Sequence, residues 1–260
     1  MLPFDFCYYL PRSLSQAGSL FEKLQKNSAK PVFFGGGTEL ISRGRVGNIT
    51  FGAAIDVKSI HELRQIKDTG KEIVIGGAVC LREIAESNVF PLLGAVVKRI
   101  ADNTIQNKIT LAGNLLGGII YREAMLPLLL LDAKVVIYEK NSTKAVGIKD
   151  LYLKTPLLNE GQLLVEIRVD KQKTCLPWFH NKVVKSEKID YPLITLCAVK
   201  ENSCIKYAVS GLYNHPCIID KESLKNIDIN QVLDDHISSA SYRVHILKQQ
   251  IQNAHKELFS

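Results

Sequence analysis

Apolar residues at helical spacing mark both ends of the chain. Near the start they follow Ser13 and Gln16, whose spacing is that of a capping box, so a capped amphipathic helix is predicted there. Near the end a longer apolar stripe predicts a second amphipathic helix. The first stripe comprises Ala17, Leu20, Phe21 and Leu24, and the second comprises Val244, Leu247, Ile251, Ala254 and Leu258.

Short apolar runs between these helices predict alternating strands and short helices, and therefore an α+β protein. Strands are predicted at 32–34, 55–57, 72–75, 134–138, 179–185, 193–199 and 205–209, and helices at 59–66, 81–86, 91–101 and 123–131. A polar connection at 170–174 interrupts this pattern and predicts a domain boundary, with one domain at 1–170 and another at 171–260.

The composition of this chain of 260 residues narrows its possible binding partners and cellular compartments. The net charge of +7 comes from scattered lysines without a basic run, which argues against nucleic acid and suits an anionic cofactor or an acidic partner surface. The longest apolar run, 125–131, is far shorter than the ~20 residues that span a bilayer, so no membrane segment is expected. The N-terminus lacks the pattern of a secretory signal, and the cytoplasm is the expected compartment.

Six cysteines show no C-x-x-C pair and no spacing typical of zinc or iron–sulfur ligands, and the six histidines show no ligand spacing either. We therefore predict no metal-binding residues in this chain. If the protein takes part in redox chemistry, its metal centres are expected on other chains.

The stretch Phe33, Phe34, Gly35, Gly36, Gly37, Thr38, Glu39, Leu40 is the most informative segment. Three glycines after an apolar strand remove every side chain from one loop, so that successive amide N–H groups can turn toward a phosphate. The alternative is a tight turn that binds nothing. The stretch lacks the Lys of a Walker loop and the third glycine of a Rossmann fingerprint.

A second loop, Thr110, Leu111, Ala112, Gly113 and Asn114, completes a pair with the first. Together they resemble the A-G-G-T-D-L and T-I-G-G-N loops of the FAD-binding medium subunits of molybdenum hydroxylases, which include xanthine dehydrogenase and carbon monoxide dehydrogenase. Further similar segments lie at 75–78, 128–133, 160–167 and 242–243, so the resemblance extends over nearly the whole chain.

The resemblance implies a two-lobed FAD-binding domain of the vanillyl-alcohol oxidase type, followed by a smaller α+β domain. The lobes would cover about 1–55 and 56–170. It also implies noncovalent FAD, with the molybdenum cofactor and [2Fe-2S] clusters on partner subunits: an iron–sulfur subunit and a molybdopterin-binding subunit.

Site residues follow from the same resemblance. The amides of 34–38, with the Thr38 hydroxyl, would hold the FAD diphosphate, and 110–114 would form the second wall. Four positions have weaker support, because a solvated Lys or Glu or a core Leu would explain them equally. These are Glu123 at the ribose, Leu163 or Leu164 at the adenine end, and Lys185, in the segment 185–190, near the flavin. Asn107 would brace the second loop.

The chain departs from the family pattern in several places, among them Ile119 and Ile120, which replace a usual Ser-Pro. Gln106 stands at the usual Arg position, Ala112 replaces a glycine, and Glu123 is longer than the usual Asp. The function implied is electron transfer from iron–sulfur clusters through FAD to NAD+, oxygen or another acceptor, with no catalytic side chain in this chain. Two alternatives stay open: a stand-alone FAD-dependent oxidoreductase and a scaffold without enzymatic activity.

Overall fold

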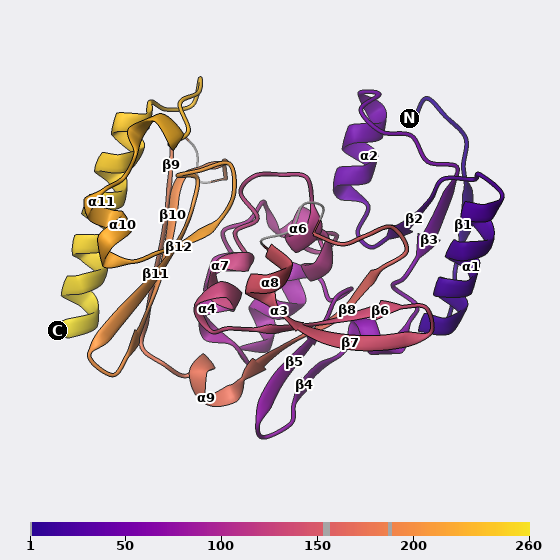
Figure 1. The fold of residues 1–260 in the computed structure, drawn as a ribbon, viewed down its shortest axis with the longest axis horizontal. Coiled ribbons are helices and arrows are strands. Elements are labelled where there is room, and N and C mark those ends of the chain that lie inside the picture. The colour runs from indigo at the N-terminus through magenta and orange to yellow at the C-terminus, as the bar shows by residue number, and fades with distance from the viewer. Residues whose placement is uncertain (1, 153–156, 187–188) are drawn as a thin grey trace.

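The computed structural model describes residues 2–152, 157–186 and 189–260, and contains three β-sheets that follow one another along the chain. Figure 1 shows the N-terminal sheet at one end of the molecule, the C-terminal sheet at the other, and the largest sheet between them. The termini lie at opposite ends of this row.

The N-terminal sheet is parallel and small. Its order is β1 (Cys7–Tyr9), β3 (Ala53–Asp56), β2 (Pro31–Phe34). The predicted first helix is confirmed as α1 (Leu14–Lys26), and the Ser13 side chain caps it by accepting from the Gln16 amide. Phe21 of α1 joins an apolar cluster that includes Ile55 of β3 and Val136 of the next sheet, so the first two sheets share a core.

The middle sheet is antiparallel, in the order β4 (Ile66–Asp68), β5 (Glu72–Gly76), β8 (Leu163–Asp170), β6 (Lys134–Glu139), β7 (Ser142–Gly147). Short helices fill the connections between its strands. They are α3 (Leu81–Ser87), α4 (Pro91–Val97), α5 (Asn103–Gln106), α6 (Leu111–Leu116) and α7 (Met125–Leu130) between β5 and β6, and α8 (Ile148–Tyr152) between β7 and β8. The 3-10 turn η1 (His61–Arg64) precedes β4, and α2 (Thr38–Arg45) precedes β3.

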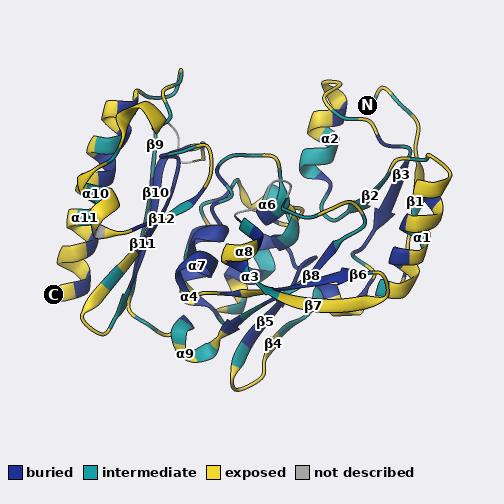
Figure 2. Ribbon diagram, viewed as in Figure 1, coloured by how far each residue is buried: buried dark blue, intermediate teal, exposed yellow. Residues whose placement is uncertain are grey.

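The C-terminal sheet is antiparallel, in the order β12 (Cys217–Ile219), β11 (Cys204–Ser210), β10 (Pro192–Glu201), β9 (Trp178–Val184). Successive residues of β10 face opposite sides, as a strand requires: Leu196 and Ala198 pack in the core with the long helix α11 (Ala240–Phe259), whereas Cys197 and Val199 belong to the core with α4 and α7. Figure 2 shows β10 buried over most of its length, and only its last two residues are partly exposed. The remaining elements are α9 (Lys171–Thr174), α10 (Lys221–Lys225) and η2 (Ile229–Gln231).

The predicted strands and the two amphipathic helices are confirmed, with ends displaced by a few residues. The predicted helix at 91–101 ends at Val97, and the one at 59–66 is only a single 3-10 turn. The segment 110–114 is not the loop we expected, because Thr110 caps a short helix that begins there. Strands β1, β4, β7 and β12 and helices α2, α5, α8, α9, α10 and η2 were not predicted, since three to eight residues carry little periodicity. Strand β8 overlaps the segment 160–167, which the resemblance alone singled out. The division into domains at about residue 170 stays a prediction.

Within the described residues, no helix combines the length and the unbroken apolar character that crossing a bilayer requires. The same part of the chain contains no group of three or more His, Cys, Asp and Glu side chains placed to hold a metal ion.

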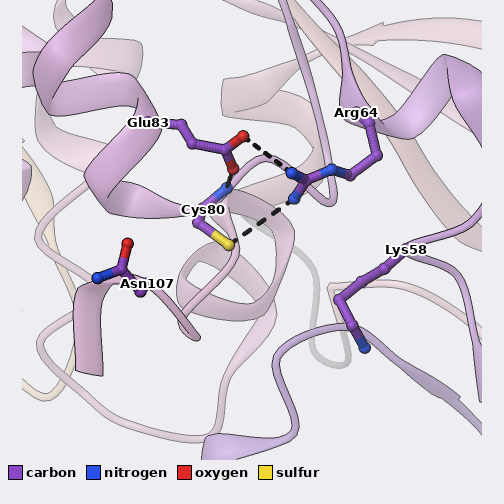
Figure 3. A pocket seen from close by; sticks show the side chains of 5 residues that line it. All are labelled: Lys58, Arg64, Cys80, Glu83 and Asn107. Carbon is purple, nitrogen blue, oxygen red and sulfur yellow. Dashed lines mark hydrogen bonds and ion pairs between the residues drawn. The ribbon is translucent and has the colours of Figure 1, made fainter. Parts of the chain in front are cut away.

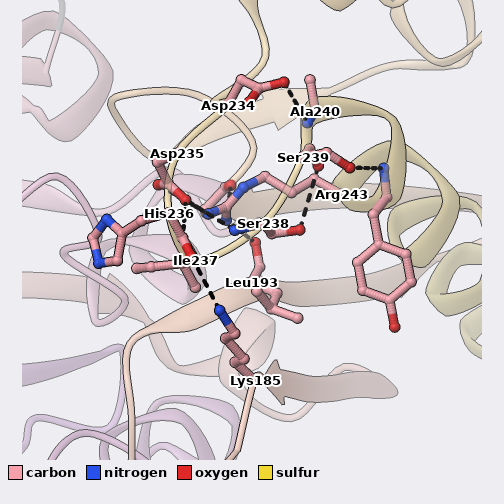
Figure 4. Close-up of polar contacts among 12 residues, drawn as sticks. Lys185, Leu193, Asp234, Asp235, His236, Ile237, Ser238, Ser239, Ala240 and Arg243 are labelled. Carbon is pink, nitrogen blue, oxygen red and sulfur yellow. Dashed lines mark hydrogen bonds and ion pairs between the residues drawn. The ribbon is translucent and has the colours of Figure 1, made fainter.

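One buried arginine ties α11 to the C-terminal sheet (Figure 4). The Arg243 side chain is fully buried, and its guanidinium donates to the carbonyls of Leu193 and Gly211 at 2.7 and 2.9 Å. It also forms two hydrogen bonds with the Asp235 carboxylate, at 2.9 and 3.0 Å. The two terminal nitrogens of the guanidinium are thus bonded to the sheet and to the loop that precedes α11, whereas the buried Nε has no partner within the described residues.

We expect Arg243→Met to lower the free energy of unfolding by about 3–5 kcal/mol, because it leaves two carbonyls and a carboxylate without their donor. Denaturant unfolding followed by circular dichroism measures this. The control is Lys248→Met on the exposed side of the same helix, which should change the free energy by less than about 0.5 kcal/mol. Equal effects of the two substitutions would contradict this role of Arg243.

Candidate functional site

The glycine loop connects β2 to α2 and is shaped by the residues on either side of it. Gly37 has a positive φ of 69° and caps α2, and a Cβ there would collide with the Phe34 ring. The Phe33 ring stacks on Phe21, with ring centroids 4.8 Å apart. Both phenylalanine side chains therefore pack within the N-terminal lobe, and this segment presents main chain to the site.

The structure brings the two predicted loops into direct contact. A Cβ on Gly36 would collide with the Lys108 carbonyl oxygen, and one on Gly35 would lie 2.8 Å from the Thr110 hydroxyl oxygen. Gly35 and Gly36 are thus required for close approach, whereas Gly37 is required for the shape of the turn. The second loop and the residues just before it therefore pack directly against the first loop.

The first loop has many unused hydrogen-bond donors. Within the described residues, the amides of residues 35–40 donate to no protein acceptor, and the first bonded amide is that of Ile41, which donates to the Gly37 carbonyl at 2.8 Å. The Thr38 hydroxyl oxygen is buried and has no partner there either. Adjacent amides at a helix N-terminus, with one hydroxyl, form an arrangement that suits a diphosphate.

The second loop is different, because four of its five amides, those of residues 111–114, are already bonded. Leu111 and Ala112 donate to the carbonyls of Val79 and Gly77, both at 2.9 Å. Gly113 donates to the Thr110 hydroxyl at 3.2 Å, and Asn114 donates to the Thr110 carbonyl at 2.9 Å. Thr110 to Asn114 thus supply a surface and side chains to the site, and the amide donors come from the first loop.

Glu39 links the two loops. Its carboxylate accepts from the Gly118 amide at 2.8 and 3.0 Å and pairs with Arg43 at 3.2 Å. This contact joins the first turn of α2, which also contains the partly buried Leu40, to the segment after α6. Asn114 accepts a hydrogen bond from the Ala124 amide at 3.3 Å, so the second loop is also fixed to the chain that leads into α7.

Glu123 lies in a buried ion pair rather than at an open surface. Its side chain is 5% exposed, and its two oxygens accept from Lys182 Nζ at 2.8 Å and from the Thr195 hydroxyl at 2.6 Å. Lys182 also donates to the Arg99 carbonyl at 2.9 Å. The carboxylate thereby joins the chain before α7 to β9 and β10, and a ribose hydroxyl would compete with this network.

The other weakly supported positions are dispersed. Leu163 and Leu164 are buried in β8, in separate apolar clusters, so only their backbone could reach a cofactor. Lys185 is exposed at the end of β9 and donates to the His236 carbonyl at 3.0 Å (Figure 4). Residues 187–188 of the same segment lie outside the described residues. Asn107 donates to Asn103 at 2.9 Å, and the bond to residues 110–114 that we expected is not among the hydrogen bonds of the described chain.

A cavity of about 460 Å³ beside the glycine loop was not found from the sequence. Figure 3 shows its lining of Lys58, Arg64, Cys80, Glu83 and Asn107. Arg64 pairs with Glu83 at 2.8 Å. Burial raises the pKa of the Cys80 thiol, which therefore stays protonated near neutral pH. The sequence did contain one signal for this cavity: two charged residues, Asp56 and Lys58, lie at the end of an apolar strand.

Sequence comparison identifies the family. Residues 4–171 match the profile described as FAD binding domain in molybdopterin dehydrogenase. The chain belongs to this family. FAD is therefore its cofactor, as the paired loops predict, and the donors of the first loop are of the kind that its diphosphate needs.

Two relatives extend the comparison beyond the family profile. The carbon monoxide dehydrogenase medium chain of Hydrogenophaga pseudoflava is 27% identical over 189 residues, which cover 70% of this chain and 65% of the relative. The nicotinate dehydrogenase FAD-subunit of Eubacterium barkeri is 24% identical over 177 residues, which cover 64% and 59%. The matched segment thus spans less than two thirds of each relative.

Solved structures confirm the predicted α+β fold class over the whole chain. Carbon monoxide dehydrogenase from Hydrogenophaga pseudoflava, in a form that lacks the Mo-pyranopterin moiety, matches with a TM-score of 0.87 and 23% identity over 100% of this chain and 99% of that one. Quinoline 2-oxidoreductase from Pseudomonas putida 86 matches with a TM-score of 0.81 and 18% identity over 99% and 98%. At these identities the matches establish the fold.

Thr38→Val tests the first loop without changing its shape. We expect the dissociation constant for FAD to rise about 10- to 100-fold, because a hydrogen bond to a charged acceptor contributes about 1.5–3 kcal/mol. The flavin-free protein should be at least as stable as wild type, since the variant removes a buried hydroxyl that has no partner in the described chain. Flavin fluorescence titration and thermal unfolding measure the two quantities.

Thr174→Val is the matched control. The Thr174 hydroxyl is buried, donates to the Lys171 carbonyl at 2.7 Å, and lies in α9, away from the loops. The Thr174→Val substitution should lower the free energy of unfolding by about 1 kcal/mol and leave the affinity for FAD unchanged. If Thr38→Val behaved like this control, the first loop would not be the diphosphate site.

Glu123 can be tested by removing its ion pair as a unit. Glu123→Gln leaves Lys182 buried without a counter-charge and should lower the free energy of unfolding by about 3–5 kcal/mol, whereas Glu123→Leu combined with Lys182→Met should restore much of it. FAD affinity measured on the stable double variant isolates the ribose contact. A loss of more than about tenfold would support that contact, and an unchanged affinity would assign Glu123 to the ion pair alone.

Proposed function

We propose that this chain is the FAD-binding electron-transfer subunit of a multi-subunit molybdenum hydroxylase. It would take electrons from the iron–sulfur clusters of a partner subunit and pass them to NAD+ or another acceptor. The observation that carries the proposal is the row of amides at 35–40 that donate to no acceptor within the described residues, together with the buried Thr38 hydroxyl, in a chain of this FAD-binding family.

The relatives support the assignment to a larger assembly. The names medium chain and FAD-subunit each describe one subunit of a dehydrogenase. Carried over to this chain, they imply partner subunits, and the resemblance of the paired loops gives these partners as an iron–sulfur subunit and a molybdopterin-binding subunit. All six cysteines are free, as is usual in the reducing cytoplasm that we propose as the compartment.

In this proposal the chain binds and orients the cofactor. The amides of the first loop and the Thr38 hydroxyl hold the diphosphate, while residues 110–114 close the opposite wall. The domain at 1–170 would form this site, and the domain at 171–260 would be fixed to it by the buried pair of Glu123 and Lys182. Bound FAD supplies the chemistry of collecting electrons singly and releasing two of them with a proton, as hydride, to an acceptor such as NAD+.

Affinity purification of the tagged chain from its native host tests the proposal. We expect a complex that contains FAD, iron and molybdenum in fixed ratios, measured by flavin analysis and elemental analysis. Substrate-dependent reduction of NAD+, or of another acceptor, should require the complex and be absent for the isolated chain.

The two alternatives predict different results in the same experiment. An isolated yellow chain that oxidises or reduces a small substrate at full rate, with neither metal, would identify a stand-alone FAD-dependent oxidoreductase. A chain that fails to take up added FAD would favour a scaffold.

A further inference from the structure

Lys58 connects the large cavity to the glycine loop. Its ammonium group donates to the Gly35 carbonyl at 2.8 Å and pairs with the Asp56 carboxylate at 2.6 Å. It also lies 5.1 Å from the centre of the Phe34 ring, which covers Gly37. One side chain therefore contacts the loop at its main chain and at the aromatic ring beneath it.

The partner of Lys58 is itself held in place. Asp56 is the last residue of β3, and its side chain is 4% exposed. Its carboxylate accepts from the Lys58 amide at 2.9 Å and from the Tyr8 hydroxyl on β1. The N-terminal sheet thus fixes the position of the Lys58 ammonium group, although the Lys58 side chain is 37% exposed to the cavity.

Holding the Gly35 carbonyl has a consequence for the next amide. Carbonyl and N–H of one planar trans peptide point in opposite directions, so a carbonyl turned toward Lys58 directs the Gly36 N–H away from it. Glycine peptides rotate readily because no Cβ restricts them. A charged donor bonded to the Gly35 carbonyl selects one orientation of the peptide between Gly35 and Gly36, which is otherwise free to rotate.

We propose that Lys58 is a positioning residue for the FAD diphosphate. By fixing the Gly35 carbonyl, it keeps the Gly36 amide turned toward the phosphate side of the loop before the cofactor binds. This inference rests on the proposed diphosphate site and adds a residue to it that lies outside both glycine loops.

Lys58→Met tests this role, and Arg64→Met is the matched control, because Arg64 is another cation lining the same cavity and makes no bond to the loop. We expect the FAD dissociation constant, measured by fluorescence titration, to rise about tenfold or more for Lys58→Met and less than about threefold for Arg64→Met, on the scale of a single charge-assisted bond. Lys58→Arg should restore most of the affinity. Equal losses for the two Met variants would show that positive charge alone matters and would overturn the proposal.

A spectroscopic measurement separates positioning from general stability. At saturating FAD, the phosphorus NMR shifts of the bound diphosphate should change in Lys58→Met and stay as in wild type in Arg64→Met. Should Lys58→Met fail to fold because Asp56 loses its partner, the same measurement on Lys58→Met combined with Asp56→Asn replaces it.

Thr38→Val distinguishes failure of this inference from failure of the diphosphate site. If Thr38→Val weakens FAD binding and Lys58→Met changes neither affinity nor phosphorus shifts, the site stands and the positioning role is wrong. If neither variant affects FAD, the proposed diphosphate site itself is wrong.

Discussion

The close approach of two stretches of main chain is the constraint on which the rest of the site depends. Gly36 lies where its missing Cβ would meet the Lys108 carbonyl oxygen, and Gly35 lies against Thr110. Any side chain at Gly36 would separate the N-terminal lobe from the helices of the middle sheet. The glycines therefore satisfy two demands at once, because they allow the lobes to meet and they leave the amides of the turn uncovered.

The two loops differ in how their amides are hydrogen-bonded, and this gives them different roles in the site. The second loop uses its amides internally, bonding to Gly77, Val79 and Thr110, and so becomes a rigid capped helix end. The first loop keeps its donors unbonded within the described chain. An anionic cofactor is held best by donors already fixed in direction, and the rigid second loop, together with the hydrogen bond that the Gly118 amide donates to Glu39, supplies that fixation.

Three departures from the family pattern, at Ala112, Gln106 and Glu123, have local physical explanations. Ala112 lies in α6 with its amide bonded to Gly77 and without a positive φ, so this position does not need glycine. Gln106 is buried, and its side-chain amide donates to the carbonyls of Lys98 and Ala101 at 3.2 and 3.1 Å, where it closes the turn after α4. Glu123 reaches both Lys182 and Thr195 in the C-terminal sheet. All three residues are accommodated within the fold.

Some features followed from the sequence because they depend on near neighbours along the chain. The capped first helix, the apolar strands and the α+β class could be predicted from local spacing. The family and its cofactor could be predicted from the resemblance of the paired loops to those of a known family. The tertiary structure alone decided which amides stay unbonded, that Glu123 is paired with Lys182, and that Lys58 holds the Gly35 carbonyl. Each of these depends on a partner brought close by folding, such as a carbonyl, a carboxylate or a buried lysine from another strand, and no local spacing encodes that proximity.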